Sequence, residues 1–220
     1  MFKYIIIYIY IIYMTSAINV VSPYIHTYLV TSISIKPTFL DNNIEEQIKI
    51  ELKKSVEGKC FEDKGYVSKV HEIIKKQETI IKPEDPYISA NFNIMFLCTL
   101  CHPLNNSYIL CYIEAYNENL IFLKRGSLNL IVNGYKNNNP KFKYSENYNC
   151  WVGIQEINGE KKAVKLKKGD FMIVRIESKL IINNSEDILC KAYLEDIATK
   201  EEIDDFTSSE LELKRMDIVK

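Results

Sequence analysis

The chain has 220 residues, 47% of them hydrophobic and 26% charged, with a formal net charge of −1 at pH 7. These values exclude a disordered chain, and the length allows either one large domain or two small ones. The charge is unevenly distributed, with 12 Lys/Arg against 5 Asp/Glu from Lys124 to Lys179, whereas acids outnumber bases 11 to 5 from Leu180 onward. Such a basic segment suits either a bound polyanion or a solvated surface with no partner.

The first residues form an apolar segment, in which Lys3 precedes eleven apolar residues, Tyr4 to Met14. This pattern is typical of a signal peptide. The run is shorter than the roughly 20 residues of a membrane span, and its tyrosine hydroxyls would find no partners in lipid. An alternative is that Met14 is the true start. We therefore treat residues 1–22 as a hydrophobic leader or extension outside the folded domains, and expect no membrane contact.

The next part of the chain predicts a strand, a helix and three further strands. Alternation over residues 27–35 predicts a half-buried strand, ended by Lys36-Pro37. An apolar residue at every fourth position then predicts a helix with one buried stripe, stopped by Gly58. The stripe consists of Leu40, Ile44, Ile48, Leu52 and Val56, with candidate caps at residues 41–43. We expect a loop over 59–64, strands over 66–74 and near 80–81, and a long strand over 88–100 that crosses into the next domain.

From Pro103 onward, short segments with a period of two predict a small closed barrel of five or six strands. The expected strands cover 107–116, 120–125, 128–134, 150–154, 171–180 and 188–194. An Asn-rich insertion over 137–149 interrupts them. The acidic tail from Thr199 could form a loose helix.

Cysteines and histidines do not form a recognisable site. Cys98-x-x-Cys101-His102 spells a haem-attachment motif, but alternation along the strand places the two thiols on opposite faces. We expect the six cysteines to be buried thiols rather than ligands or disulfides. Neither the spacing of the histidines nor any glycine-rich loop or nucleophile motif supports a metal site, a cofactor or catalysis.

The order of several short motifs resembles the RNA polymerase stalk subunit family, the seventh subunit of eukaryotic polymerase II and the archaeal E subunit. The matching residues are Ser34-Ile35-Lys36-Pro37, Val56-x-Gly58-Lys59-Cys60, Gly65-Tyr66-Val67, Asn91-Phe92-Asn93, Pro103, Asn117-x-x-x-Ile121-Phe122, Gly126, Lys168-Gly169-Asp170 and 187–196. They cover residues 24 to 197. Leu120, where the family usually has glycine, and the Asn-rich insertion suggest a divergent viral copy.

The resemblance implies an α+β, mainly β fold with a truncated RNP-like tip domain over 23–102. An OB-fold domain over 103–198 and an acidic tail over 199–220 would follow. It also implies a non-catalytic subunit that docks on the polymerase core and contacts single-stranded RNA. The docking loop would comprise Gly58, Lys59, Cys60, Gly65 and Tyr66. The helix near residues 43–56 and its neighbouring strands would pack onto a small stalk partner subunit. The expected location is intracellular, in a viral factory or virion, or in the nucleus for a cellular subunit.

Aromatic and basic side chains mark the expected RNA site, because OB-folds stack bases on aromatics and track phosphates with Lys and Arg. The resemblance places Phe122 on the binding face, and Lys124 and Arg125 follow on the same strand. Alanine at these three positions should weaken RNA binding and leave the fold intact. Four further candidates lie in or beside the long loop: Lys141, Lys143, Tyr144 and Trp151. Trp151 could instead cap the core, and a second basic cluster over 161–168 could be merely solvated.

Two other function classes remain open. A secreted or membrane-anchored β-rich protein would use the first residues as a signal, with Asn105 and Asn183 as glycosylation sequons. A free-standing OB-fold protein would bind single strands without a polymerase.

Overall fold

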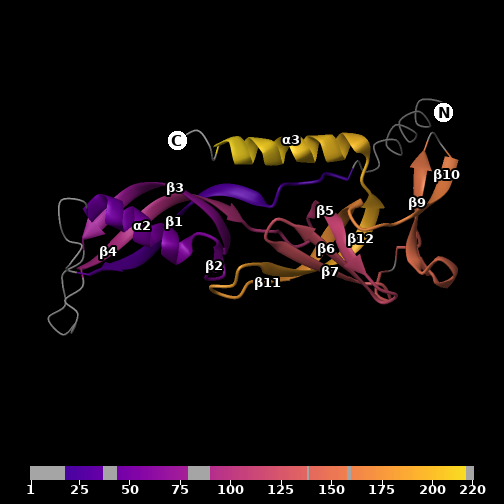
Figure 1. Cartoon of the computed structure of the whole chain (residues 1–220), viewed down its shortest axis with the longest axis horizontal. Helices are drawn as coiled ribbons and strands as arrows, with labels where there is room; N and C mark the ends of the chain where they lie inside the picture. Colours follow the sequence, from indigo (N-terminus) through magenta and orange to yellow (C-terminus); the bar gives the residue numbers. More distant parts are fainter. Residues whose placement is uncertain (1–17, 37–43, 79–89, 138, 158–159, 217–220) are drawn as a thin grey trace, which may run out of the picture.

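Three β-structures lie in a row along the molecule in the computed structural model, which describes residues 18–36, 44–78, 90–137, 139–157 and 160–216. Figure 1 shows a four-stranded sheet at one end, a closed five-stranded barrel in the middle and a three-stranded sheet at the other end. The predicted class, mainly β with a tip domain followed by a barrel, is confirmed. The predicted domain boundaries remain predictions.

The tip domain is an antiparallel sheet covered on one face by a single helix. Its strands have the order β1-β4-β3-β2. The elements are β1 (Tyr24–Ile35), α2 (Ile44–Val56), β2 (Lys59–Phe61), β3 (Gly65–Glu78) and β4 (Ala90–Cys101). The predicted stripe of α2 is confirmed over the described residues, because Ile48, Leu52 and Val56 are all buried. Leu40, the caps over 41–43 and the strand near 80–81 lie outside the described residues.

The segment expected as a loop over 59–64 is a tight hairpin instead. Lys59 pairs with Val67 and Phe61 with Gly65, so β2 adds a fourth strand to the sheet. Glu62 takes a positive φ of 47° in the turn. Three residues of ladder are too few to show a period, which is why alternation did not reveal this strand.

Strand β4 connects the two main hydrophobic cores. Phe92, Phe96 and Cys98 belong to the core under α2, whereas Cys101 belongs to the barrel core. The predictions that this strand crosses between domains and that Cys98 and Cys101 face opposite sides are both confirmed.

The barrel closes in the order β11-β12-β7-β6-β5. Its strands are β5 (Tyr108–Tyr116), β6 (Leu120–Arg125), β7 (Leu128–Asn133), β11 (Phe171–Leu180) and β12 (Ile188–Ile197). Strand β12 pairs parallel with β7, and the other pairs are antiparallel. Ile121, Leu130 and Val174 are among the side chains that fill the interior.

A small sheet, which we call the wing, separates β7 from β11. It consists of β8 (Phe142–Ser145), β9 (Cys150–Ile157) and β10 (Glu160–Lys165), in the order β10-β9-β8. A short 3-10 turn (Glu146–Tyr148) connects β8 to β9. The Asn-rich segment over 137–149, expected as a long loop, therefore contains β8 and the 3-10 turn, and the assignment of 150–154 to the barrel is wrong. Strand β10 was not predicted because it begins with Glu160-Lys161-Lys162. Charged residues on both faces of a strand leave no alternation of polar and apolar residues.

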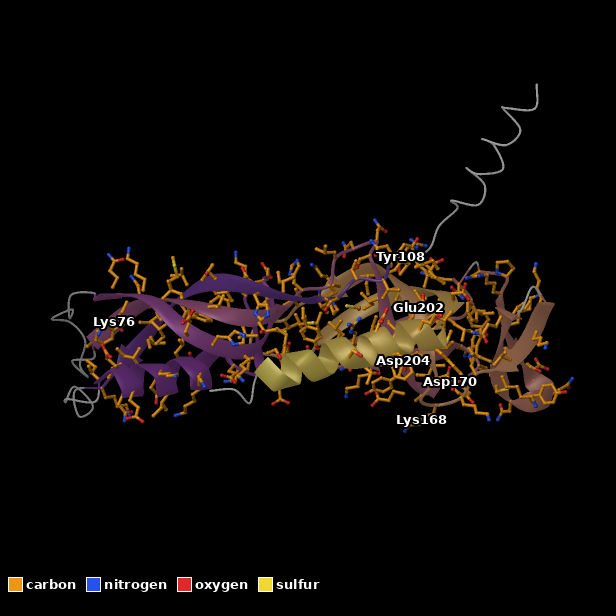
Figure 2. The ribbon with its side chains drawn as sticks, turned by 90° about the horizontal axis from the view of Figure 1, so that it is seen from above. Lys76, Tyr108, Lys168, Asp170, Glu202 and Asp204 are labelled. Carbon is orange, nitrogen blue, oxygen red and sulfur yellow. The ribbon has the colours of Figure 1, made fainter. Side chains whose placement is uncertain are left out.

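The acidic tail forms α3 (Lys200–Met216), a regular helix rather than a loose one. A capping box starts it: the Thr199 N–H donates to Glu202 Oε2 (2.7 Å), and the Glu202 N–H donates to Thr199 Oγ1 (3.3 Å). Ile203 and Phe206 pack on Leu110 and Ile173 of the barrel. Figures 1 and 2 show α3 extending from the barrel toward the tip domain, with Glu202 and Asp204 in its first turns.

The expected hydrophobic leader falls mostly outside the described residues, since the structure describes only its last part, from residue 18 onward. Within that described part of the chain, no helix has the length and apolar character that crossing a membrane requires.

Candidate nucleic-acid interface and docking loop

The outer face of β6 carries the predicted aromatic and basic side chains Phe122 and Lys124. Both are half-buried, and they lie beside Ile131 and Asn129 of β7. The carboxylate of Glu114 lies 3.9 Å from Lys124 Nζ, but both side chains are largely solvated, so this pair neutralises little. The second and third strands of OB-folds are the usual oligonucleotide-binding face, and in this barrel they are β6 and β7.

Arg125 does not lie on that face, although it follows Lys124 directly. Its side chain is only 4% exposed, and Nη1 donates to the Leu110 carbonyl oxygen (3.3 Å). The guanidinium also lies 4.6 Å from the centre of the Phe206 ring. Strand β5 pairs with β6 only from Tyr112 to Tyr116, so Arg125 donates to a carbonyl beyond the end of that ladder. Contrary to the expectation from the sequence, we therefore expect that replacing Arg125 disturbs the fold.

The wing presents lysines on one face. In register, Lys143, Val152 and Lys165 form one row across its three strands, so their side chains share a face. Ala163 and Ile154 form the next row. Lys143 and Lys165 are exposed, and Lys165 Nζ lies 3.5 Å from the centre of the Tyr148 ring. Lys141 forms an ion pair with Asp196 (2.6 Å), so part of its charge is neutralised.

The opposite face of the wing packs against the barrel. Trp151 is 4% exposed, belongs to the barrel core and donates from Nε1 to the Asn117 carbonyl oxygen (2.8 Å). Of the two roles left open by the sequence, capping the core is the one the structure shows. A base cannot stack on an indole that is already covered on both sides.

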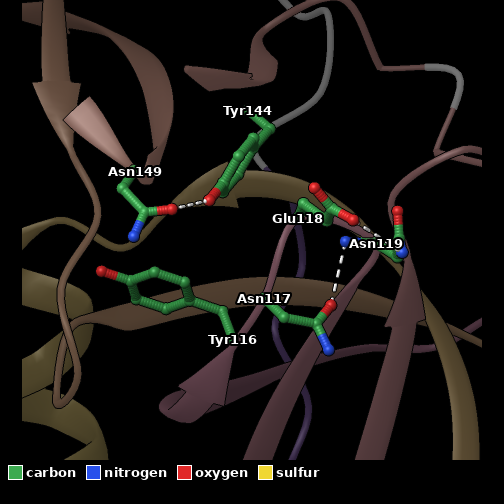
Figure 3. A pocket seen from close by; sticks show the side chains of 6 residues that line it. All are labelled: Tyr116, Asn117, Glu118, Asn119, Tyr144 and Asn149. Carbon is green, nitrogen blue, oxygen red and sulfur yellow. Dashed lines mark hydrogen bonds between the residues drawn. The ribbon is translucent and has the colours of Figure 1, made fainter. Parts of the chain in front are cut away.

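Tyr144 contributes to a pocket between the wing and the β5–β6 turn. The pocket has a volume of about 470 Å³ and is lined by Tyr116, Asn117, Glu118, Asn119, Tyr144 and Asn149. Figure 3 shows Tyr144 coming from the wing and Tyr116 from the barrel, with Glu118 and Asn119 to one side. Partial burial, and then the charge of Glu118, raise the pKa of the Tyr144 phenol, which keeps it protonated. The Tyr144 hydroxyl donates to Asn149 Oδ1.

A β-bulge is the reason Tyr116 lines this pocket. The register of β5 against β6 shifts between Ile113 and Ala115, so Tyr112 lies opposite Lys124 whereas Tyr116 lies opposite the buried Ile121. Bulges re-aim side chains in this way, often beside functional sites. An unbroken period of two would place Tyr112 and Tyr116 on one face, so the sequence contains no sign of the pocket beyond the Asn-rich turn.

The predicted docking loop is the β2–β3 hairpin, and part of it is occupied by the barrel. Cys60 is 1% exposed; its N–H donates to the Ser185 carbonyl (2.8 Å) and its carbonyl accepts from the Asn184 N–H (2.9 Å). Tyr66 packs against the barrel core, and Lys59 Nζ donates to the Lys54 carbonyl (3.2 Å). The exposed part of the hairpin is its turn, residues 62–64.

The two glycines of the hairpin are required to different extents. Gly65 has a φ of +140°, and a Cβ there would lie 2.3 Å from the Cys101 carbonyl oxygen. Gly58 has a φ of +77° with open space around it. Turn geometry thus explains both residues without reference to a partner, and docking by this loop stays a prediction.

The thiols and imidazoles of the described residues show no reactive arrangement. All six cysteines are buried and unpaired, and burial raises the pKa of Cys98 and of Cys101 each to about 11. Neutral buried thiols are poor nucleophiles and poor metal ligands. Among the residues that the structure describes, no three His, Cys, Asp or Glu side chains are grouped to hold a metal ion.

Two comparisons with known proteins agree with this architecture. Residues 31–86 match the family described as "SHS2 domain found in N terminus of Rpb7p/Rpc25p/MJ0397". The chain is also 25% identical over 197 residues to "Putative DNA-directed RNA polymerase subunit L376" of Acanthamoeba polyphaga mimivirus, which covers 90% of this chain and 94% of that protein. The family match falls on the tip domain, and the viral relative extends the similarity through the barrel. The predicted resemblance to the stalk subunit family is thereby confirmed: the tip domain is similar to the N-terminal domain of Rpb7-type subunits, and most of the chain is similar to a viral protein named as an RNA polymerase subunit.

Proposed function

We propose that this protein is a non-catalytic stalk subunit of a multisubunit DNA-dependent RNA polymerase. The observation that carries the proposal is the ordered pair of domains, an Rpb7-type tip domain followed by a five-stranded barrel, in a chain similar along most of its length to a protein named as a polymerase subunit. Such a subunit works inside the cell, in a viral factory or virion if viral and in the nucleus if cellular.

The docking part of this proposal is tested by affinity purification of the tagged chain from cells that express it with its polymerase. We expect the large polymerase subunits to be recovered. A chain carrying Asp63→Lys in the exposed hairpin turn should recover less of them than one carrying Glu114→Lys on the barrel. Recovery of the tagged chain alone would show that it acts without a polymerase, as a free-standing OB-fold protein does.

A second part of the proposal is that the barrel and the wing hold single-stranded RNA. Phe122 and Lys124 on β6, Lys141 and Lys143 at the wing, and Tyr144 between them combine stacking surfaces with cations. Each stacked base contributes about 1–3 kcal/mol in such proteins, and phosphate contacts make the affinity salt-dependent.

RNA binding is tested with a charge-matched pair of double variants. Lys143→Ala/Lys165→Ala removes two exposed wing lysines, and Lys53→Ala/Lys54→Ala removes two lysines from the last turn of α2. The wing variant should lower the slope of log affinity against log salt by about 1.4, because each lost phosphate contact on a single strand contributes about 0.7. The α2 variant should leave the slope unchanged. Equal slopes for wild type and both double variants would show that the two wing lysines do not contact RNA phosphates.

A third part concerns the small partner subunit, which we place on the open face of the tip sheet. Tyr28 is 60% exposed and Val30 56% exposed, and they lie opposite Leu97 and Met95 of β4. The outward side of α2 is mainly charged, with Ile50 as its exposed aliphatic residue. An apolar strip on the sheet face opposite α2, which no helix of the described residues covers, is the better surface for a protein partner.

Two lysine substitutions separate these surfaces. Val30→Lys should abolish co-purification of a small subunit, whereas Ile50→Lys should not. The two variants are matched, because each replaces an exposed aliphatic residue with the same positive charge. The reverse result would place the partner on α2, which the resemblance implied together with its neighbouring strands.

A further inference from the structure

The pocket between the wing and the β5–β6 turn has the shape and chemistry of a base-binding site. Two phenol rings line it, Tyr116 from the end of β5 and Tyr144 from the edge strand of the wing (Figure 3). Both rings are anchored: Tyr116 packs on the barrel core, and Tyr144 packs edge-on against Trp151, with ring centres 5.7 Å apart. Fixed aromatic faces are what single-strand binding proteins use to receive unstacked bases.

The polar groups of the pocket favour a neutral, hydrogen-bonding ligand over a phosphate. Among the described residues that line it, none is a lysine, arginine or histidine, and Glu118 adds a negative charge. Asn119 Oδ1 is enclosed and has no hydrogen-bond partner, and the Glu118 carboxylate holds only a long contact from Asn119 Nδ2 (3.4 Å). The pocket therefore offers the exposed Glu118 carboxylate, which lacks a strong protein donor. The enclosed Asn119 Oδ1 would gain a hydrogen bond if its amide turned toward a donor of the ligand.

We propose that this pocket binds one unstacked RNA base that carries an exocyclic amino group, and that it discriminates against uracil. The inference rests on the proposed RNA binding and adds a base preference to it. Amino groups of cytosine, adenine and guanine supply donors to Glu118 and Asn119, whereas uracil presents carbonyl oxygens at the corresponding edge. Uracil has one donor on this edge, N3–H, between two carbonyl oxygens, so it can satisfy at most one of the two acceptors and turns a carbonyl toward the other.

The surroundings place the sugar-phosphate chain outside this pocket. Lys143 precedes Tyr144 on β8, the edge strand of the wing, and neighbouring residues of a strand point to opposite faces. Lys143 therefore lies on the other face of the wing from the Tyr144 ring, at the same edge. On the barrel side, β6 begins directly after Asn119 and leads along Phe122 to Lys124. A strand that crosses this edge can hold its phosphates on the lysines while one base enters between the tyrosines.

The test compares binding of oligocytidylate and oligouridylate of equal length, measured by fluorescence anisotropy with the full chain. The two bases have the same size, and the edge that carries the amino group of cytosine carries an oxygen in uracil. We expect the cytidine oligomer to bind at least about fivefold more tightly, the lower end of the discrimination that a good base-edge contact provides.

Two variants locate the preference in the pocket. Glu118→Gln and Asn119→Ala should each reduce the ratio of cytidine to uridine affinity and change uridine binding little. Both keep the turn, because Asn117 Oδ1 accepts its side-chain hydrogen bonds from the N–H groups of residues 119 and 120. Glu62→Gln in the hairpin of the tip domain, an exposed carboxylate far from the pocket, is the matched control and should keep the wild-type ratio.

The possible outcomes distinguish a failure of the base pocket from a failure of the proposed RNA binding. Salt-dependent binding of both oligomers with equal affinity, unchanged by Glu118→Gln, would overturn the base pocket and leave RNA binding standing. No binding of either oligomer would overturn the proposed RNA contact and the pocket with it. A preference that survives both variants would place the discrimination elsewhere on the barrel.

Discussion

Lys124 and Arg125 are neighbours in the sequence and occupy opposite environments. Lys124 lies on the outer face of β6, whereas Arg125 points inward and hydrogen-bonds a carbonyl of β5. We expect Arg125→Ala to lower the free energy of unfolding by about 2–3 kcal/mol, because it leaves the Leu110 carbonyl without its donor and removes the contact with Phe206. Lys124→Ala should change it by less than about 0.5 kcal/mol. Urea unfolding of the two variants checks this, and equal losses would contradict the burial of Arg125.

Buried thiols provide a second prediction at the level of single residues. Burial raises the pKa of Cys98 to about 11 and that of Cys190 to about 12, above the ordinary value of 9.0. Below pH 9.0 both states of the protein keep these protons, so the shifts do not change stability. Above it the unfolded chain releases protons that the folded chain retains, and stability falls by up to about 1.4 kcal/mol per pH unit for each thiol.

The measurement is the free energy of unfolding followed from neutral to alkaline pH. Cys98→Ala should be less stable than wild type at neutral pH because it leaves a cavity, but its stability should fall less steeply in alkali. Parallel curves for the two proteins would show that this thiol ionises with its ordinary pKa in the folded state.

At the scale of elements, the sequence predicted those with a clear period and missed those without one. Leu29, Ile33 and Ile35 of β1 and the stripe of α2 were placed on the correct faces because each element buries one side only. Strand β2 is too short to show alternation, and β10 is charged on both faces. The β5 bulge adds one residue to a ladder, which no periodicity reveals, so the inward position of Tyr116 could not be predicted. For the same reason the pocket had to be found in the structure, although Tyr144 was already a candidate.

The β2–β3 hairpin allows a prediction about its two glycines. Gly65→Ala should destabilise the tip domain by about 3 kcal/mol or more, because its Cβ would collide with backbone of β4 that cannot move aside. Gly58→Ala meets open space and should cost only about 1 kcal/mol, the strain of a positive φ. Thermal unfolding measures both changes. Similar losses at the two sites would mean that β4 does not approach Gly65 this closely.

At the scale of the whole molecule, hydrogen bonds join the tip domain to the barrel on two sides of the hairpin. The β11–β12 loop pairs with Cys60, and Asn183 Oδ1 accepts from the Glu62 N–H (3.0 Å). On the other side, Lys179 of β11 donates to His102 Nε2 (2.9 Å) and to the Pro103 carbonyl (2.8 Å), while His102 Nδ1 contacts the Lys64 carbonyl. These bonds on both sides of the hairpin favour a stiff junction, which the proposed function requires if the barrel is to hold RNA at a set distance from the docking surface.

The Lys179 side chain should hold this side of the junction together. Its ammonium group donates to both His102 Nε2 and the Pro103 carbonyl, and His102 Nδ1 contacts the Lys64 carbonyl. Burial lowers the pKa of Lys179, which indicates that this ammonium group has lost water and depends on its protein acceptors. Lys179→Met should therefore loosen the junction, whereas Lys191→Met, at an exposed lysine of β12, should not. Small-angle scattering at neutral pH should show a larger radius of gyration for Lys179→Met and no change for Lys191→Met. An unchanged radius for Lys179→Met would mean that the Cys60 pairing alone holds the junction.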